Sequence, residues 1–448
     1  MEQAQAAEKL ETAALLAALG RVAPQAEIGV TEATAADAVA GVAPQVVVEP
    51  QDEEGVAAVL RYASSEGLVV IPRGGGTQLD WGAPPRRADI ILSLARLSGL
   101  IEHAPQDLTF TVRAGTPLVD LQRELGKANQ WLAIDPPVAA GATIGGIIAT
   151  NVTGPRRQRY LGVRDQIIGI RVALADGTIA RGGGKVVKNV AGYDLPKLYC
   201  GSLGTLGVIL AASFRLYPIP PFSGSALIEA GAIEPLCALA LRILALPVTP
   251  VALDLFPELE SGRTPVLAVR FESAVSGAID DQIATISQLA RDEGLAVSAV
   301  RDAADAEWWA AGDAWMAKID EHSMETLDLK ASLLPTDVST WLTLLEATRA
   351  DLPGLAELRW RARMGLGIVV ARLSGAPEAM ASWVEGIERR RAAAVERRGS
   401  LIVTRTPPAL RGRLDLWGPA NGLALMRSLK ERFDPNATLN PGRFVGGV

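Results

Sequence analysis

Three glycine-rich segments contain the residues whose types and spacing could support chemistry. They are residues 72–77 (Pro-Arg-Gly-Gly-Gly-Thr), 141–146 (Gly-Ala-Thr-Ile-Gly-Gly) and 201–207 (Gly-Ser-Leu-Gly-Thr-Leu-Gly). Glycine leaves backbone N–H groups uncovered by a side chain, which a loop needs if it is to bind a diphosphate or a flat ring. Because the segments lie within about one domain length, they predict one elongated cofactor held at several points.

Two common nucleotide-binding loops do not fit these segments. A Rossmann loop has the spacing Gly-x-Gly-x-x-Gly before a helix, whereas residues 201–207 have Gly-x-x-Gly-x-x-Gly and lead into the strand-like run Val-Ile-Leu. A P-loop has Ser or Thr after its lysine, but valine follows Lys185 in Gly-Gly-Gly-Lys. Each segment taken alone could instead be a tight turn, and that alternative stays open at this point.

The composition disfavours several other classes of function. The net charge of −6, from 44 basic and 50 acidic residues among 448, provides no basic surface for nucleic acid. Cys200 and Cys237 are the only cysteines, and His103 and His322 are the only histidines. So few potential ligands disfavour a metal site, and two cysteines are typical of a reducing compartment rather than of a disulfide framework.

No segment predicts targeting or a membrane span. Residues 1–20 have a helical pattern but lack a basic stretch followed by an apolar core, so no signal peptide is expected. The apolar run 236–246 contains Arg242 and ends at Pro247, which makes it too short to cross a bilayer. The chain is therefore expected to be soluble and cytoplasmic.

The elements that must position the glycine segments follow an α+β pattern. From residue 45, short runs rich in β-branched residues alternate with helical stretches such as 53–66. The turn Ala175-Asp176-Gly177-Thr178 predicts a hairpin, and three prolines within residues 217–221 predict a domain boundary. Beyond that boundary, we expect an antiparallel sheet covered on one side by helices. The strands predicted before it are 46–48, 69–71, 90–94, 109–112 and 168–174.

The order of these motifs resembles the FAD-binding domain of the vanillyl-alcohol oxidase / p-cresol methylhydroxylase family. The resemblance lies in the first segment, in Ala-Thr-Ile-Gly-Gly with Asn151 downstream, and in Gly-Ser-x-Gly-Thr-Leu-Gly-Val-Ile. Residues 154–157, 163–165 and 183–195, with Leu-Asn-Pro-Gly-Arg at 439–443, more narrowly resemble the FAD-binding subunits of bacterial glycolate oxidases. The likeness is specific over residues 46–220 and in the C-terminal tail, and loose between them.

The resemblance implies an α+β fold in which two subdomains enclose FAD and an α+β cap domain with an antiparallel sheet follows. The expected division is a helical N-terminal extension at 1–40, an FAD-binding domain at 41–220, a cap domain at 221–400, and a segment at 401–448 that returns to the FAD domain. Residues 73–77 and 145–146 would bind the pyrophosphate, and residues 201–209 would line the adenine and ribose. The full implied set is Pro72, Arg73, Gly74, Gly75, Gly76, Thr77, Thr143, Gly145, Gly146, Asn151, Gly201, Ser202, Gly204, Thr205, Gly207, Val208 and Ile209.

Three departures from the family pattern qualify what the resemblance implies. Leu203 stands where many relatives have glutamate, so one polar contact of the third segment is absent. The first segment lacks the histidine through which some members attach flavin, so FAD is expected to be non-covalent. Hydroxy-acid dehydrogenases of the family often have a histidine-and-carboxylate metal site, and this chain has no histidine pair to build one, which puts independent catalysis in doubt.

By the same resemblance, the chain is expected to be the FAD-binding subunit of a complex that oxidises glycolate to glyoxylate. Its expected partners are a larger FAD-bearing catalytic subunit and an iron–sulfur subunit, through which electrons would reach the membrane quinone pool. Two alternatives stay open. The chain could be a free-standing FAD-dependent dehydrogenase of another small 2-hydroxy acid such as D-lactate, or a non-catalytic FAD-binding assembly subunit.

Oxidation of a 2-hydroxy acid by a flavin needs a cation for the carboxylate and a base for the hydroxyl proton. Lys330 and Arg372 are the candidate cations, although exposed sheet residues would have the same pattern. His322 is the candidate base, with a surface loop as its alternative, and His103 is expected in a turn. Three further candidates remain: Tyr193 near the flavin, where neighbouring Asp194 could simply cap a helix, and Arg156 with Arg157 beside a phosphate or a partner.

Overall fold

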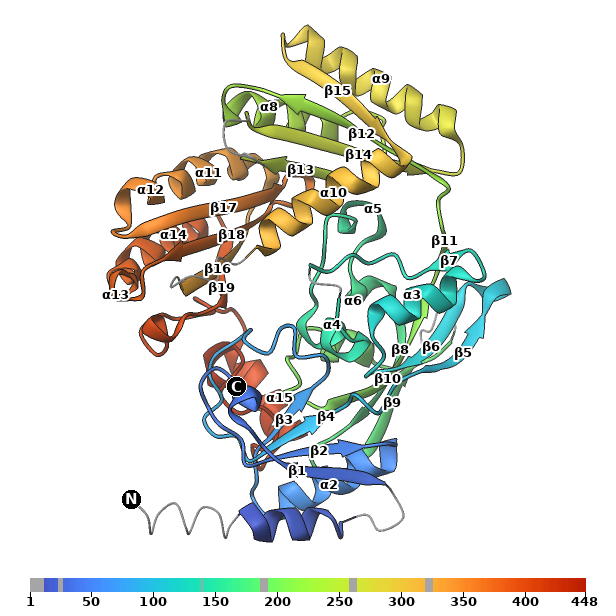
Figure 1. Cartoon of the computed structure of the whole chain (residues 1–448), viewed down its shortest axis with the longest axis vertical. Helices are drawn as coiled ribbons and strands as arrows, with labels where there is room; N and C mark the ends of the chain where they lie inside the picture. Colours follow the sequence, from blue (N-terminus) through green and yellow to red (C-terminus); the bar gives the residue numbers. More distant parts are fainter. Residues whose placement is uncertain (1–11, 23–26, 138–139, 186–191, 258–263, 319–324) are drawn as a thin grey trace. The chain divides into compact units, whose positions relative to one another are not determined.

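The computed structural model describes residues 12–22, 27–137, 140–185, 192–257, 264–318 and 325–448. The chain divides into two compact units, whose elements are labelled in Figure 1. Unit 1 comprises residues 1–152, 162–219 and 419–448, and unit 2 comprises residues 153–161 and 220–418. Each unit therefore contains segments that are distant from one another in sequence.

The first sheet of unit 1 carries the strand that leads into the first glycine segment. Its order is β1 (Ile28–Glu32), β2 (Val46–Pro50), β4 (Ile90–Ser93) and β3 (Val70–Arg73), with β1 antiparallel to β2 and the other pairs parallel. Helix α2 (Glu53–Ser65) begins where the Asp52 carboxylate accepts a hydrogen bond from the Gly55 amide at 2.7 Å. Its apolar face is buried in the core, so β2, α2 and β3 form a crossover that delivers residues 74–77 to one edge of the sheet.

A second, antiparallel sheet forms most of the remainder of unit 1. Its order is β5 (Leu100–Ala104), β6 (Thr109–Arg113), β10 (Val208–Arg215), β8 (Ile167–Ala173) and β9 (Ile179–Gly183). Phe110 stacks on Phe214 across β6 and β10, with ring centroids 5.4 Å apart. Strands β8 and β9 form the expected hairpin, whose turn requires the φ of 80° that Gly177 adopts. His103 lies in β5, with its Nε2 2.9 Å from Oε1 of Gln130, so the expectation of a turn was wrong.

The C-terminal part of the chain is built into unit 1 as well. After helix α15 (Leu423–Phe433), Leu439 pairs in parallel with Val70 of β3, and the Val70 amide donates to the Thr438 carbonyl at 2.7 Å. The other elements of the unit are short. They are α3 (Leu118–Gly126), α4 (Ile144–Thr150), α6 (Val163–Gln166), α7 (Leu195–Tyr199), β7 (Gln130–Trp131) and β11 (Tyr217–Pro218).

Unit 2 is organised around one antiparallel sheet of eight strands. The order is β15 (Ala296–Arg301), β12 (Phe222–Glu229), β14 (Val266–Ser273), β13 (Ala252–Phe256), β17 (Leu355–Arg363), β18 (Ile368–Gly375), β16 (Glu325–Ser332) and β19 (Ser400–Arg405). Its helices are α5 (Arg157–Tyr160), α8 (Ile233–Leu244), α9 (Ser276–Asp292), α10 (Asp302–Ala317), α11 (Val338–Glu346), α12 (Thr348–Asp351), α13 (Pro377–Met380) and α14 (Trp383–Glu396).

Helices cover both faces of this sheet, which differs from the expectation of one covered side. Trp360 and Arg361 are neighbours on β17, so their side chains point to opposite faces. Trp360 donates a hydrogen bond to Glu346 of α11, whereas Arg361 donates to Asp313 of α10. The face toward α10 is rich in charge, because Arg359, Arg361 and Arg363 alternate along the same strand.

The α+β fold with an antiparallel sheet in the second part of the chain is confirmed. Two details differ from the expected division. Strand β1 pairs with β2, so part of the N-terminal segment belongs to the first sheet, and β19 pairs with β16, so the chain re-enters unit 1 at Pro419 rather than at residue 401. Among the described residues, no helix is both long and apolar enough to cross a membrane.

Candidate functional site

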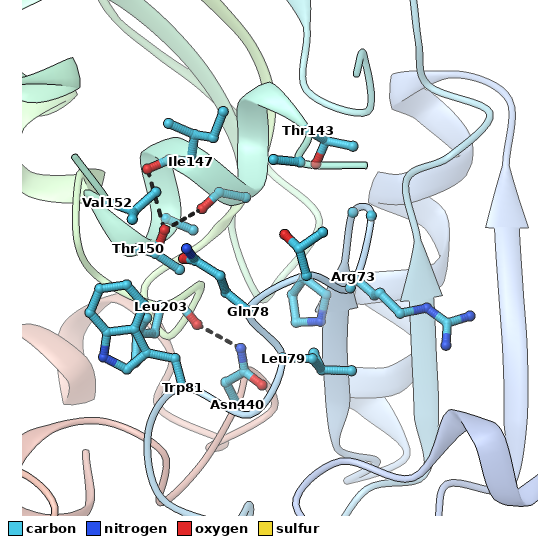
Figure 2. A pocket seen from close by; sticks show the side chains of 18 of the residues that line it. Arg73, Gln78, Leu79, Trp81, Thr143, Ile147, Thr150, Val152, Leu203 and Asn440 are labelled. Atoms are coloured by element: carbon cyan, nitrogen blue, oxygen red, sulfur yellow. Dashed lines mark hydrogen bonds between the residues drawn. The ribbon is translucent and has the colours of Figure 1, made fainter. Parts of the chain in front are cut away.

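A pocket in unit 1 is formed where four separate segments of the chain meet. The end of β3 and the loop after it supply residues 72–79 and Trp81, and α4 with the residues on either side of it supplies a second wall. Leu203 contributes from the third glycine segment, and Asn440 and Arg443 contribute from the C-terminal tail. Figure 2 shows Leu203, Trp81 and Asn440 together at one side of this pocket.

The first glycine segment can approach α4 only because it lacks side chains. A Cβ atom on Gly74 would lie 2.0 Å from Oγ1 of Thr143, and one on Gly75 would lie 1.7 Å from the carbonyl oxygen of Gly141. Both distances are far below van der Waals contact, so the backbone of the first segment packs directly against the Thr143 side chain and the Gly141 backbone. Gly76 is different, because it has a φ of 73° and open space where a Cβ atom would be. Position 76 therefore needs glycine for its backbone conformation rather than for close packing, and it lines the pocket.

The amides of residues 74–77 are the main hydrogen-bond donors of the pocket. Within the described parts of the chain, none of these four amides donates to a protein acceptor, and the same holds for the Gly146 amide in the first turn of α4. Thr143 Oγ1 is buried and also has no protein partner there. Consecutive unpaired N–H groups next to a helix N-terminus suit the phosphate oxygens of a dinucleotide, so the residues present fit FAD.

Gly145 has a packing role rather than a donor role. Its amide donates to the Ala114 carbonyl at 2.7 Å, and a Cβ atom there would lie 2.9 Å from that of Ala114. The expectation that it would offer its N–H to pyrophosphate therefore does not fit the structure. Asn151 ends α4 with a φ of 51° and lies outside the pocket lining.

The third glycine segment mostly satisfies its own hydrogen bonds. The Gly201 amide donates to Ile148, and the hydroxyls of Ser202 and Thr205 donate to the carbonyls of Tyr199 and Ser202. Leu203, with a φ of 51°, is the residue of this segment that reaches the pocket. Gly201, Ser202, Gly204, Thr205, Gly207, Val208 and Ile209 do not line it.

The C-terminal tail contributes site residues that were not among the predicted cofactor contacts. Asn440 donates from Nδ2 to the Leu203 carbonyl at 2.6 Å, and Arg443 donates to the carbonyl of Trp81 at 2.7 Å. Burial lowers the pKa of Arg443 to about 10, against an opposing effect of Asp80. The Leu-Asn-Pro-Gly-Arg motif at 439–443 was a sequence signal for this wall, because it combines turn formers with two polar side chains. Gln78, Leu79 and Trp81 carried no such signal.

Arg73 lies at the rim of the pocket in an ion pair rather than free for phosphate. Its Nη1 is 2.7 Å from Oδ1 of Asp37. Burial by itself would raise the pKa of Asp37, but the hydrogen bonds from Arg73 and Thr34 outweigh it, so the pKa lies below its usual value. The side chain of Arg73 points away from the other labelled residues in Figure 2.

Unit 2 contains Lys330, one of the two candidate cations. Lys330 lies on β16 opposite Val370, on the same sheet face as Arg361. Burial, together with the nearby charges of Arg363 and Arg157, lowers its pKa to about 8. Three cations thus lie close enough for their charges to affect one another.

Arg372, the other candidate cation, is fully engaged within unit 2. Its Nε and Nη2 donate to the two carboxylate oxygens of Asp328, each at 2.7 Å, and Nη1 donates to carbonyls at the end of α10. Its strand position therefore serves a structural ion pair, which corrects the expectation that it would bind a substrate carboxylate.

The remaining candidates are dispersed. Tyr193 is 92% exposed, and Asp194 forms an ion pair with Lys197 instead of capping α7. Arg156 donates to Glu272 at 2.7 Å, which also accepts a hydrogen bond from Tyr160. Because Glu272 neutralises the charge of Arg156 within unit 2, Arg156 does not serve as a phosphate partner. His322 lies outside the described residues.

Comparison with known proteins agrees with the geometry of the pocket. Residues 44–183 match the family model described as an FAD binding domain, and residues 416–444 match the C-terminal domain of FAD linked oxidases. The first match contains the loop after β3 and helix α4, and the second contains the tail that supplies Asn440 and Arg443. Unit 1 therefore carries an FAD-binding domain.

Several curated proteins are similar to this chain. Glycolate oxidase subunit GlcD of Bacillus subtilis is 36% identical over 177 residues, which is 40% of this chain and 38% of that protein. A probable mitochondrial D-lactate dehydrogenase of Danio rerio is 30% identical over 61% of this chain and 58% of its own length. A D-2-hydroxyglutarate dehydrogenase of Xanthomonas citri is 27% identical over 89% of both. The chain thus spans well under two thirds of the first two relatives.

A solved structure with the same fold covers most of the chain. An alkyldihydroxyacetonephosphate synthase superposes with a TM-score of 0.70 over 90% of this chain and 78% of the other, at 17% sequence identity. At that identity the likeness concerns the fold alone.

Proposed function

We propose that this chain binds FAD non-covalently in the pocket of unit 1 and takes part in the oxidation of a small 2-hydroxy acid. The observation that carries the proposal is the row of four backbone amides at residues 74–77, which have no acceptor among the described residues and lie inside the FAD-binding match. The residues that line the pocket include no histidine or cysteine, which favours a cofactor held without a covalent bond.

In this proposal, the amides of residues 74–77 and Gly146 hold the phosphates, and the side chains that line the rest of the pocket hold the remainder of the cofactor. FAD, when bound, supplies an acceptor for the hydride of the substrate's C–H bond. The chain's own contribution is to bind and orient the cofactor and to neutralise its charge with N–H dipoles.

Lys330 is the proposed partner of the substrate carboxylate. It is half-buried on β16, and Arg363 and Arg157 are close enough for their charges to lower its pKa, so this region carries positive charge that would attract a carboxylate. Tyr193, which is exposed and belongs to unit 1, is proposed to lie near the flavin. The proton of the substrate hydroxyl has no assigned base among the described residues.

The finer proposal is that the substrate is glycolate and that the chain works with a larger FAD-bearing subunit and an iron–sulfur subunit. The relative named as a glycolate oxidase subunit supports it. D-lactate and D-2-hydroxyglutarate are equally compatible with the relatives named for those substrates. A role as a non-catalytic FAD-binding assembly subunit remains the alternative in which flavin binds but meets no substrate.

The deciding experiment is an anaerobic visible-light titration of the FAD-loaded chain with glycolate, D-lactate and D-2-hydroxyglutarate in turn. Bleaching of the oxidised flavin band by one of them would identify the substrate and show that the chain has its own substrate site. Bleaching that needs added partner subunits would favour the complex. A purified chain that neither contains FAD nor takes it up would overturn the proposal as a whole.

A further inference from the structure

We infer that Lys430 and Asp434 are positioning residues for the FAD pocket, because they hold the C-terminal tail against the third glycine segment and so keep Asn440 in the pocket wall. The tail here means residues 438–443, which include the Leu-Asn-Pro-Gly-Arg motif. Neither Lys430 nor Asp434 lines the pocket, so their effect must pass through the tail. The inference rests on the proposed function and identifies residues that serve the same site.

Lys430 is unusual because it is a buried lysine on the surface helix α15. Among the residues of this helix, Lys430 is the one that is buried, at 8% exposure, whereas Leu425 is 66% exposed. This reverses the usual pattern, in which a surface helix buries apolar residues and exposes lysine. A buried ammonium group is costly unless each of its N–H groups is paired, so a specific set of acceptors must compensate for it.

Such a set of acceptors is present around the ammonium group. Nζ donates to the Thr205 carbonyl at 2.8 Å, to the Leu439 carbonyl at 2.7 Å and to Asp434 Oδ2 at 2.5 Å. These acceptors belong to the third glycine segment, the tail and α15. Since an ammonium group has three N–H donors, the arrangement uses all of them and ties three segments together.

Asp434 fixes the start of the tail from the other side. Its Oδ1 accepts from the Thr438 amide at 2.9 Å, and its Oδ2 accepts from the Leu439 amide at 2.8 Å. The tail is also joined to β3, because the Asn440 amide donates to the Val70 carbonyl at 3.1 Å. The backbone N–H and C=O groups of Thr438 and Leu439 and the N–H of Asn440 are therefore all hydrogen-bonded.

Asn440 is the residue through which this junction reaches the pocket. Its Nδ2 donates to the Leu203 carbonyl, which leaves Oδ1 as an acceptor. That oxygen is buried and has no protein partner in the described parts of the chain. Because a buried carbonyl oxygen is usually hydrogen-bonded, Oδ1 is suited to accept an N–H or O–H of the cofactor. Figure 2 shows the Asn440 side chain beside Leu203, on the pocket side.

The test compares FAD affinity in Lys430→Met and in a matched control, Lys127→Met. Lys127 lies in the same unit, forms an exposed ion pair with Glu124 at 2.6 Å and does not line the pocket. We expect Lys430→Met to weaken FAD binding about tenfold, as measured by fluorescence titration of the apoprotein, and Lys127→Met to leave it within about twofold. Far-UV circular dichroism of each apoprotein checks that it is folded.

A double-mutant cycle separates a positioning role from a general loss of stability. Asn440→Ala should weaken FAD binding about tenfold, and the double variant with Lys430→Met should lose little more, because both changes remove the same contact. The visible spectrum of bound flavin at saturation should shift in the same way in both single variants. Multiplied losses in the double variant, or an unchanged affinity in folded Lys430→Met, would overturn the inference.

Two further measurements keep the outcome interpretable. If Lys430→Met does not fold, Asp434→Asn replaces it, since it preserves the shape of the side chain and weakens its hold on the Thr438 and Leu439 amides. Wild-type chain that fails to bind FAD would contradict the proposed function itself. Wild-type chain that binds FAD, alongside a folded Asp434→Asn or Lys430→Met variant of equal affinity, would contradict this inference alone.

Discussion

At the scale of single residues, the structure separates two cations that look alike in sequence. Arg372 and Lys330 lie on neighbouring strands of unit 2, β18 and β16, and both face the charged side of the sheet. Arg372 has a bidentate carboxylate partner, and although burial alone would lower its pKa, Asp328 raises it above its usual value. For Lys330, burial and then the charges of Arg363 and Arg157 lower the pKa. The difference predicts that Lys330 responds to pH and to anions, whereas Arg372 does not.

The lowered pKa of Lys330 predicts a pH-dependent contribution to stability. Folded Lys330 loses its proton near pH 8 while the unfolded lysine keeps it to about 10.5, so between these values the unfolded state binds more protons. Stability should therefore rise with pH in the wild type relative to Lys330→Met, by up to about 3 kcal/mol. Urea unfolding of both at pH 7 and pH 10 measures this change, and equal changes in the two would contradict it.

The same group predicts the pH dependence of substrate use. If Lys330 binds the substrate carboxylate, kcat/KM should fall as pH rises through about 8, because the neutral amine no longer attracts the anion. Lys330→Arg should remove this fall, since arginine stays protonated throughout the range. Lys318→Arg, on an exposed residue of unit 2, is the control and should keep the wild-type profile. A fall that persists in Lys330→Arg would assign the titration to another group.

At the scale of elements, the pocket depends on how closely the loop after β3 approaches the start of α4. The strands and the helix bring the two loops together, but the contact distance is set by Gly74 and Gly75. Gly76 is required for a different reason, because its φ of 73° lies in the left-handed region that favours glycine. The three consecutive glycines thus serve two purposes: Gly74 and Gly75 allow close packing, and Gly76 allows a positive φ.

Gly75→Ala should abolish the approach between these loops. The added Cβ would meet the Gly141 carbonyl oxygen at 1.7 Å, so the loop must move outward and the amides of residues 74–77 lose their common direction. We expect FAD affinity to fall at least about tenfold. Gly126→Ala is the control, because the end of α3 has open space at that position and alanine favours a helix. Fluorescence titration with FAD compares them, and wild-type affinity in Gly75→Ala would refute the packing argument.

At the scale of the whole molecule, each unit has its own means of stability. Unit 1 buries a continuous apolar core that runs through its four-stranded and five-stranded sheets. Unit 2 adds buried charge. Arg361, 3% exposed, lies 2.5 Å from Oδ2 of Asp254, 1% exposed, and its guanidinium stands over the ring of Phe256 at 4.7 Å. Arg270 is paired in the same way with fully buried Asp305. Breaking such a pair leaves an uncompensated charge, so its loss should destabilise unit 2.

Asp254→Asn should lower the unfolding free energy of unit 2 by about 3 kcal/mol, because buried Arg361 would lose its closest counter-charge. Asp280→Asn, which removes the partner of Arg301 in an exposed pair of the same unit, should cost less than about 1 kcal/mol. Calorimetry measures both.

The same experiment can assign the two units to separate transitions. Saturating FAD should stabilise unit 1 by about 2.7 kcal/mol at one hundred times its dissociation constant. The transition that FAD raises should therefore not be the one that Asp254→Asn lowers. A single transition that responds to both would mean that the two units unfold together.

The sequence by itself determined the features that depend on neighbouring residues. The glycine runs, the hairpin turn at Gly177, most strands of unit 1 and the break near residue 219 are all encoded in a few adjacent positions, because φ preferences and strand alternation are local. The same local motifs carried the resemblance that led to FAD, which the matches at residues 44–183 and 416–444 bear out.

Only the tertiary structure decided which of these residues serve the pocket. Gly145 and Gly146 are adjacent and chemically identical, yet one amide is taken by Ala114 and the other stays open. Asn440 comes from the C-terminal part of the chain; Lys430 holds the preceding residue, Leu439, and Asn440 donates to the Leu203 carbonyl. Arg372 is paired with Asp328 on the neighbouring strand, so it is not a candidate for binding the substrate. Hydrogen-bond partners are assigned by distance in space, and a sequence records only distance along the chain.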